Sequence, residues 1–423
     1  MVLGLDPPSY DGPLSSPDGA TETATVDATP PNPPGKLDDP ARWSTYKSQG
    51  ASYVAGPFDG RFIYFIRAAD DDGPDAGLTG SRILRYDTTV EKFDEPSAWT
   101  AFDPEVSVGT TGPHLAAVLD GQWLVVAGYA DGIFIRFNTQ SPSNDFGFAS
   151  SWETFDAKGL ASNSLGYDTA VPIANDGGIA YTNAGRLSAL KHTGNDVFDG
   201  GWQAAPFDAG AESTFGCSAT REGACVGTQL YLGPAANGTT ACLARWDETK
   251  PFNEQTSWES FDINKLGEDF AQVHGTITTD RHLYFTQYNT KDAAAPVKLI
   301  RRPLNGALDA GWESQATNIK NPLTRGFIGG VFDGRFLYLS PYPVGTQNVI
   351  YTRYDTTIAL ADPAAWDVVA GAALGIPANR SWGAVFDGQY VYYTSYAALD
   401  NGGATFARFK AYDYKVPLPP TCR

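Results

Sequence analysis

The histidines are the first residues of this sequence to consider for chemistry, and the chain has only four of them. His114 and His274 each lie seven residues before a residue of a recurring tight turn, Gly121 and Arg281. We interpret the two as aligned positions of a repeat. A histidine together with a tyrosine such as Tyr288 could act as base and acid in β-elimination of an acidic polysaccharide. The alternative is that each imidazole is only hydrogen-bonded where a strand begins.

A second group combines aromatic rings with arginines. It consists of Arg325, Tyr342, Arg380, Trp382 and Tyr396. Rings stack on flat ligands, and guanidinium groups bind carboxylates in a bidentate manner, so the group predicts a site for an acidic or sugar-like ligand. The alternatives are that Trp382 fills space inside the fold, that the arginines offset local acidity and that the tyrosines pack between sheets.

An acidic loop offers the remaining chemistry. Asp70, Asp71, Asp72 and Asp75 could hold a structural calcium ion, although the loop lacks the complete spacing of an EF-hand. The alternative is a solvated acidic loop. We expect no other cofactor, because the sequence contains no Gly-x-Ser-x-Gly elbow, phosphate-binding glycine loop, His-Glu-x-x-His or dinucleotide fingerprint.

A repeated hairpin sequence predicts the β-strands that position these residues. Phe332-Asp333-Gly334-Arg335-Phe336-Leu337-Tyr338 has near-copies from Phe58 and from Phe386, and looser versions at Leu119 and Asp280. Each copy predicts a strand, a tight turn and a second strand. Small residues before the turn, as in Gly329-Gly330-Val331, predict that the first strand is the innermost of its sheet.

The spacing of the tryptophans gives the length of the sequence repeat. Tryptophan recurs at intervals of 50 to 56 residues, at Trp43, Trp99, Trp152, Trp202, Trp258, Trp312 and Trp366. Between the hairpin and the tryptophan lies a third strand, such as Ile83-Leu84-Arg85-Tyr86-Asp87. Four strands per unit and this period predict an all-β fold, a seven-bladed β-propeller of four-stranded antiparallel blades. Because Trp43 precedes the first inner strand and the last unit has no tryptophan, we expect the strand around Trp43 to close the ring as the outermost strand of the last blade.

The repeats resemble, in the broad kelch-like and WD-like sense, those of secreted bacterial β-propeller repeat proteins. The resemblance covers residues 39–416. It implies the fold and no functional residue, because the repeats do not share the Gly-Gly pair that follows the second strand of kelch repeats, and they lack the combination of an upstream Gly-His with a Trp-Asp strand ending that defines WD repeats. Any residue carried by most blades is expected to serve the blade, and the residues that break the symmetry are the candidates for function.

The net charge of the protein limits the kinds of molecule that it can bind. The formal charge of -18 and the pI near 4.5 argue against nucleic acid and against anionic lipid. No run of apolar residues is long enough to insert directly into a membrane.

The ends of the sequence predict an exported protein. Residues 1–38 are acidic and rich in Pro, Ser and Thr, which predicts a disordered spacer; residues 417–423 form a short tail. The start at Met1 has neither the basic region nor the apolar core of a secretory signal. We nevertheless expect an extracellular or cell-surface domain, tethered by the spacer, whose export signal is missing from this sequence. Of the four cysteines, Cys217, Cys225, Cys242 and Cys422, the first three lie close together, and a single disulfide within residues 217–242 could then form; four cysteines allow three connectivities, and the sequence does not choose among them.

The leading functional hypothesis is a non-catalytic binding or scaffold module that recognises carbohydrate or protein through the irregular loops of the propeller. One alternative is a polysaccharide lyase that acts on acidic glycans through His114 or His274 and a tyrosine. The other is a structural subunit of a cell-surface assembly.

Overall fold

The computed structural model describes residues 34–48, 52–68, 82–129, 131–140, 145–160, 166–173, 178–183, 189–193, 197–205, 220–234, 242–266, 273–289, 295–344, 348–398 and 405–419. Most of the predicted spacer and the calcium candidates Asp70, Asp71, Asp72 and Asp75 lie outside these ranges. No helix within them is long and apolar enough to cross a membrane.

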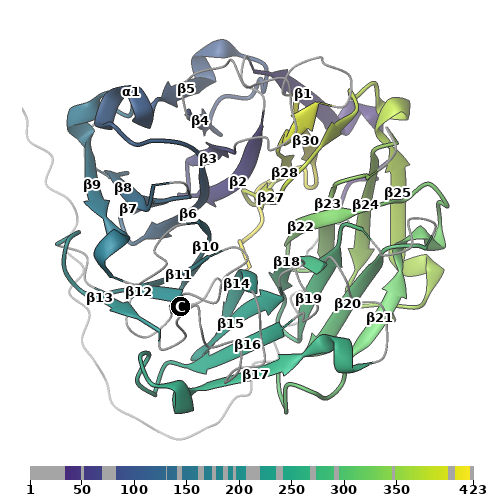
Figure 1. Ribbon diagram of the computed structural model, residues 1–423. Helices are drawn as coiled ribbons and strands as arrows, with labels where there is room; N and C mark the ends of the chain where they lie inside the picture. Colours follow the sequence, from purple (N-terminus) through teal and green to yellow (C-terminus); the bar gives the residue numbers. More distant parts are fainter. Residues whose placement is uncertain are drawn as a thin grey trace, which may run out of the picture. The chain divides into compact units, whose positions relative to one another are not determined.

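The described chain forms seven four-stranded antiparallel sheets, which are the predicted blades. Their first strands contact one another in order, blade one to blade seven and back to blade one, so the blades form a closed ring (Figure 1). Blade one contains β2–β5, and each following blade takes the next four strands as far as β25. Blade seven contains β27, β28, β30 and β1. The predicted fold is confirmed.

The strands occupy equivalent places in the blades. The innermost strands are β2 (Tyr53–Phe58), β6 (His114–Asp120), β10 (Tyr167–Pro172), β14 (Thr220–Val226), β18 (Val273–Thr278), β22 (Phe327–Phe332) and β27 (Ala384–Phe386). The second strands are β3 (Phe62–Arg67), β7 (Trp123–Gly128), β11 (Ile179–Asn183), β15 (Gln229–Pro234), β19 (His282–Gln287), β23 (Phe336–Pro341) and β28 (Tyr390–Tyr393). The third strands are β4 (Ile83–Asp87), β8 (Ile133–Asn138), β12 (Ala189–His192), β16 (Cys242–Asp247), β20 (Lys298–Pro303), β24 (Ile350–Asp355) and β30 (Thr405–Lys410). The outermost are β5 (Trp99–Phe102), β9 (Trp152–Asp156), β13 (Trp202–Ala204), β17 (Trp258–Asp262), β21 (Glu313–Ala316), β25 (Trp366–Ala370) and β1 (Trp43–Lys47).

Short helices flank the outermost strands. Single 3-10 turns precede them at η1 (Pro40–Arg42), η2 (Pro96–Ala98), η3 (Ala149–Ser151), η5 (Gln255–Ser257) and η8 (Pro363–Ala365). Others follow them at η4 (Ala157–Gly159), η6 (Ile263–Leu266), η7 (Thr317–Ile319) and η9 (Gly371–Leu374), and α1 (Pro104–Val108) follows β5. A small extra pair, β26 (Asn379–Arg380) and β29 (Ala397–Ala398), lies beside blade seven.

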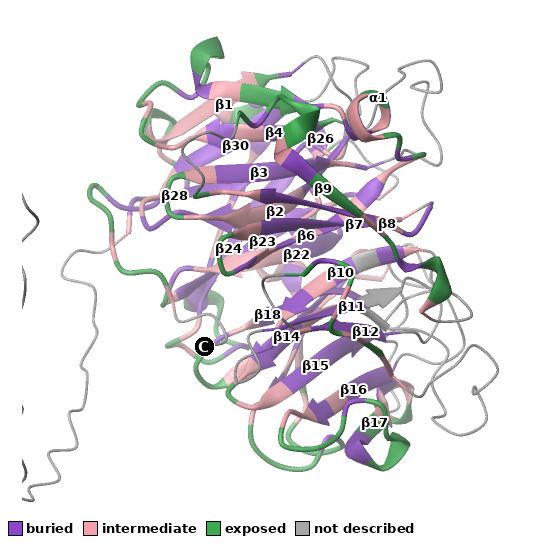
Figure 2. Cartoon of the chain, turned by 90° about the vertical axis from the view of Figure 1, so that its left-hand side faces the viewer, coloured by how far each residue is buried: buried purple, intermediate pink, exposed green. Residues whose placement is uncertain are grey.

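The ring has two different faces. The turns between first and second strands and the loops that lead to the outermost strands lie on one side, which we call the turn face. The loops between second and third strands and the links between blades lie on the other, the loop face. Burial follows the same layers: β15 is almost wholly buried, whereas β9 carries exposed residues (Figure 2).

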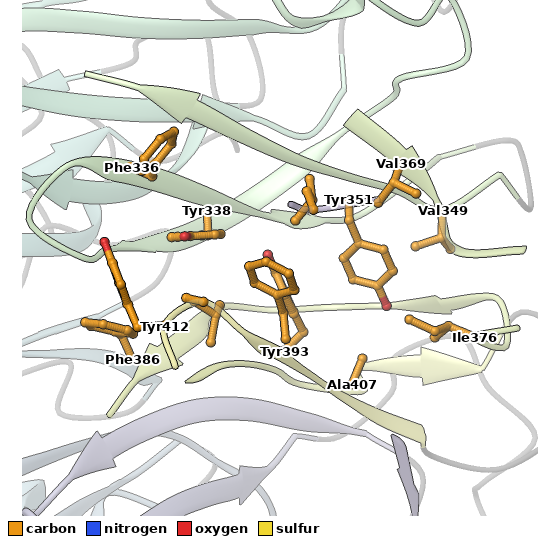
Figure 3. Close-up of a cluster of buried hydrophobic side chains, with 14 residues drawn as sticks. Phe336, Tyr338, Val349, Tyr351, Val369, Ile376, Phe386, Tyr393, Ala407 and Tyr412 are labelled. Atoms are coloured by element: carbon orange, nitrogen blue, oxygen red, sulfur yellow. The ribbon is translucent and has the colours of Figure 1, made fainter. Parts of the chain in front are cut away.

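The N-terminal strand closes the ring as predicted. β1 pairs antiparallel with β30, from Trp43 opposite Phe409 to Lys47 opposite Thr405. The chain before it is also anchored: Leu37 is buried in the apolar cluster between blades six and seven, and the Gly35 carbonyl accepts a hydrogen bond from Arg353 at 2.8 Å. That cluster contains Tyr338, and Tyr412 from beyond the last strand packs into it (Figure 3).

The repeated turn aspartate shapes the hairpin. The Asp333 carboxylate accepts hydrogen bonds from the backbone N–H groups of Arg335 and Phe336 at 2.8 and 2.7 Å, and Asp59 and Asp387 accept the same pair in their turns. In blade five the hydroxyl of Thr279 accepts this pair. The turn of blade five therefore begins at Thr279, one residue before the aspartate of the sequence pattern.

The other repeated residues serve the blades too. In five blades the indole N–H of the tryptophan donates to a backbone carbonyl six residues earlier: Trp43 to Leu37, Trp99 to Phe93, Trp152 to Phe146, Trp258 to Phe252 and Trp366 to Leu360. The third-strand arginine pairs with a carboxylate of the outermost strand in four blades: Arg136 with Glu153, Arg245 with Glu259, Arg301 with Glu313 and Arg353 with Asp367. Repetition thus marks structural residues.

Two cysteines within the described ranges, Cys225 and Cys242, are disulfide-bonded. They cannot be bonded to each other. Cys225 lies opposite Leu230, and Leu230 lies opposite Trp246, four residues from Cys242. At about 3.3 Å per residue along the strand, the separation far exceeds the roughly 7 Å limit between the Cα atoms of a disulfide.

We predict that Cys225 pairs with Cys422 and that Cys217 pairs with Cys242. Cys225 is at the turn-face end of β14, and the C-terminal segment reaches this face, where Val416 donates to the carbonyl of Gly388 at 2.7 Å. Cys242 begins β16 on the loop face, and Cys217 is only three residues before β14, which also begins there. Peptide mapping under non-reducing conditions checks this, and a peptide that links Cys217 to Cys225 would contradict it.

Candidate functional site

Five aromatic rings of blades five, six and seven form a closed cycle on the loop face, which we call the loop-face cluster. His274 contacts Tyr288, with ring centroids 6.0 Å apart, and Tyr288 contacts Tyr342 at 6.0 Å. Tyr342 contacts Tyr396 at 5.7 Å, and Tyr396 contacts Trp382 at 4.7 Å. Trp382 completes the cycle with His274 at 5.0 Å. The structure thus brings together residues that the sequence analysis selected for two different reasons.

Equivalent strand positions explain how the cluster assembles. The three tyrosines directly follow or nearly follow the second strands of their blades, and each is half-buried. His274 and Trp382 lie two blades apart, yet their rings touch because the inner strands pack closely. A Cβ at Gly275 would overlap the backbone of Gly329, and one at Gly383 would press on Ala55. Glycine at these places lets the blades approach, and each of these glycines has a positive φ.

Arg380 lies at the edge of this cluster. Its guanidinium carbon is 5.1 Å from the centroid of the Tyr342 ring, and its Nε donates to the Pro343 carbonyl at 3.2 Å. No carboxylate in the described ranges pairs with Arg380, unlike the third-strand arginines of four blades. Arg325 is held differently, by a 3.0 Å hydrogen bond from Nη1 to the Ala295 carbonyl.

Glu222 completes the site, and the sequence analysis did not select it. Its Oε1 is 2.9 Å from Nδ1 of His274, and its Oε2 accepts from the backbone N–H of Thr276 at 3.1 Å. Its own N–H donates to the Thr169 hydroxyl at 2.6 Å. The His274 side chain is 1% exposed and that of Glu222 is 22% exposed. The imidazole is therefore buried, whereas the carboxylate is partly exposed to solvent.

Glu222 also has an unusual backbone. It is the one non-glycine residue in the described ranges with a positive φ, 57°. The equivalent positions in the next three blades are Gly275, Gly329 and Gly383, with φ of 87°, 65° and 81°. A non-glycine residue in this region costs of order 1–3 kcal/mol. The signal in the sequence was a glutamate in a place where three neighbouring blades have glycine.

His114 is not equivalent to His274, which corrects the predicted alignment. Because the turn of blade five begins at Thr279, His114 corresponds to Val273 in register. His114 pairs with Gly128, the sixth residue of β7, whereas His274 pairs with Thr286, the fifth residue of β19. Side chains alternate along a strand, so the one-residue offset directs the two imidazoles to opposite sides.

His114 is a buried, isolated group. Its side chain is 1% exposed, and neither ring nitrogen has a hydrogen-bond partner among the described residues. Burial lowers the pKa of His114 to about 4, although the carboxylates of Asp131 and Glu105 oppose the shift. The neutral imidazole acts as an apolar group in the wall of blade two.

A polar hollow of about 220 Å³ lies elsewhere, on the turn-face side of blade four. Its lining includes Arg245, Asp247, Lys250 and Glu259. Arg245 and Glu259 form an ion pair at 2.6 Å, and no aromatic side chain lines it. The arginine of this hollow is thus already paired with a carboxylate, in contrast to Arg380. Within the described ranges, no three histidine, cysteine or acidic side chains are placed to hold a metal ion.

Comparison with known proteins supports the fold. No protein-family model and no curated protein matches the chain. Among solved structures, the β-propeller domain of Myceliophteria thermophila Cps50 (Swd1) is 11% identical with a TM-score of 0.52, covering 88% of this chain and 100% of that one. The WD40 repeats of RRP9 are 10% identical with a TM-score of 0.52, covering 88% and 98%. Kuenenia stuttgartiensis hydrazine synthase is 11% identical with a TM-score of 0.53, covering 83% and 94%. The chain is a seven-bladed β-propeller, and at these identities the likeness extends to the fold alone.

Proposed function

We propose that this protein is an exported binding module that recognises acidic carbohydrate through the loop-face cluster. The observation that carries the proposal is Arg380, a cation beside the half-buried rings of Tyr342, Trp382 and Tyr396 for which the described residues provide no carboxylate. In a chain with a formal charge of -18, such an arginine is suited to a ligand that brings its own anion. A uronate ring would stack on the aromatic rings and present its carboxylate to the guanidinium.

Two further observations support export and binding. Cys225 and Cys242 are both disulfide-bonded, which is typical of proteins outside the cytosol. The residues that the blades share are engaged in turns, ion pairs and packing. The symmetry-breaking residues of the last three blades therefore remain as the candidates for recognition.

The lyase alternative receives less support. His114 and His274 are both 1% exposed, so neither imidazole can reach a substrate proton unless covering side chains move. The Glu222–His274 hydrogen bond is the one feature in its favour, because a carboxylate can orient a base. The binding assay distinguishes the two functions, since β-elimination would generate an unsaturated product that absorbs in the ultraviolet.

The test is calorimetric titration of the full chain with oligogalacturonate and with cello-oligosaccharide of equal length. We expect oligogalacturonate to bind more tightly. Arg380→Met should weaken its binding about tenfold or more, because a hydrogen bond to a charged group contributes roughly 1.5–3 kcal/mol. Binding of the neutral oligosaccharide should change little. Trp382→Ala should weaken both, because it removes the stacking surface.

Arg281→Met is the matched control, because Arg281 is an exposed arginine in the turn of blade five. It should leave both affinities unchanged. Equal binding by wild type and Arg380→Met would remove Arg380 from the site. The absence of binding to either oligosaccharide would contradict the carbohydrate proposal and favour a protein ligand, and a rise in ultraviolet absorbance would favour the lyase.

A further inference from the structure

We propose that Glu222 is a positioning residue of the loop-face cluster, which acts through His274 on Trp382 and Tyr288. The inference rests on the proposed function, since its consequence is a change in ligand binding at that cluster. It goes beyond the proposed function because Glu222 belongs to blade four, outside the three blades that supply the rings.

The Glu222 carboxylate is hydrogen-bonded to the His274 imidazole. Both oxygens of Glu222 are engaged, one with Nδ1 of His274 at 2.9 Å and the other with the N–H of Thr276 at 3.1 Å. A carboxylate oxygen is an acceptor, so Nδ1 must carry the proton. The hydrogen bond at one ring nitrogen sets the protonation of the other, and the two contacts therefore determine both the tautomer and the plane of the ring.

The His274 imidazole in turn contacts two of the rings that would face the ligand. The His274 ring meets Trp382 at 85° and Tyr288 at 83°, with centroids 5.0 and 6.0 Å away. Near-perpendicular contacts on two rings mean that any rotation of the buried imidazole displaces both neighbours. Since Trp382 and Tyr288 are half-buried whereas His274 is buried, the effect of Glu222 reaches the ligand through the tryptophan and the tyrosine.

Glutamate occupies a strained backbone position where the three following blades have glycine. Gly275, Gly329 and Gly383 build the same backbone feature in the following blades without a side chain. The path of the chain therefore does not require a carboxylate, and glycine would adopt it more easily. A strained residue that the backbone does not need indicates a role for its side chain, and its partner here is His274.

The experiment compares the full-length wild type with Glu222→Gly and Glu222→Gln. Glu259→Gln is the control, because Glu259 is an exposed carboxylate of the same blade that pairs with Arg245. ¹⁵N-imidazole NMR reports the tautomer of His274, whose signals are assigned with His274→Gln. Calorimetry gives the affinity for oligogalacturonate, and thermal unfolding gives the melting temperature.

We expect wild type and Glu259→Gln to show His274 protonated at Nδ1, and both Glu222 variants to show a mixture of tautomers. Affinity for oligogalacturonate should fall about tenfold in Glu222→Gly, within the usual range for coupled neighbours. Its melting temperature should stay close to that of wild type, because glycine relieves the backbone. Glu222→Gln keeps the side-chain volume. If the glycine variant does not fold, this variant shows whether the carboxylate sets the His274 tautomer and the affinity for oligogalacturonate.

An unchanged His274 tautomer in the Glu222 variants would overturn the proposal, and so would an altered tautomer with unaltered affinity. If wild type binds no oligogalacturonate, the proposed function fails. The tautomer comparison then decides alone whether Glu222 fixes the orientation of His274.

Discussion

A chain that begins at residue 49, and so lacks β1, is expected to lose cooperative unfolding. Trp43 packs on Tyr351, Phe409 and Tyr393 with centroids 4.6, 5.0 and 5.9 Å away, and Tyr46 stacks on Trp99 at 4.0 Å. Truncation of a fully buried tryptophan or phenylalanine to alanine costs about 3–5 kcal/mol, and the partly buried Trp43 and Tyr46 each contribute somewhat less. The loss of two, together with the backbone pairing to β30, approaches the roughly 5–15 kcal/mol that stabilises a whole domain.

β1 matters this much because it joins two apolar clusters. Trp43 belongs to the cluster between blades six and seven, whereas Tyr46 packs in the cluster between blades seven and one. Its removal also exposes β30 as an unpaired sheet edge, which favours aggregation. Thermal unfolding followed by near-ultraviolet circular dichroism checks the prediction, and a chain that begins at residue 34 is the control. A sharp transition at the wild-type temperature without β1 would show that the ring closes by other contacts.

His114 is expected to make the protein less stable as the pH falls from 6.5 towards 4. Burial lowers its pKa to about 4 in the folded protein, from the ordinary histidine value of 6.5. Between these values the unfolded chain binds a proton that the folded chain does not, so acidification favours unfolding. At about 1.4 kcal/mol per pH unit, the effect amounts to roughly 3 kcal/mol, and it vanishes above pH 6.5.

The variant His114→Leu isolates this effect from the titration of the many carboxylates. The wild type should lose more free energy of unfolding than His114→Leu between pH 7 and pH 4.5, as measured by urea denaturation at each pH. His282→Leu is the matched control. The pKa of His282 is also lowered, by burial and by Arg301, but its side chain is only half-buried. If the free energy of unfolding depends on pH in the same way in wild type and in His114→Leu, the pKa of His114 is not lowered in the folded protein and the prediction is wrong.

The blade pattern was readable in the sequence because it depends on short-range rules. Asp333 and its equivalents form turns within a few residues, and a tryptophan such as Trp366 bonds to a carbonyl only six residues away. Such signals recur in most units and reinforce each other. Alignment of the blades by the turn aspartate failed in blade five. There Thr279 takes the place of that aspartate, and Asp280, one residue later, was aligned with it by mistake. That one-residue error produced the incorrect equivalence of His114 and His274.

The sequence by itself thus determined seven blades, their strand order and the closure by β1, since each follows from a local period and from counting its copies. It also selected Trp382, Arg380 and the tyrosines, because they depart from the repeat. Only the tertiary structure decided which of these residues meet. His274, Trp382 and Glu222 are separated by about 50 to 160 residues, and their contacts depend on how closely glycine-bearing inner strands approach around the ring. That packing distance is a property of the whole ring, and no single repeat encodes it.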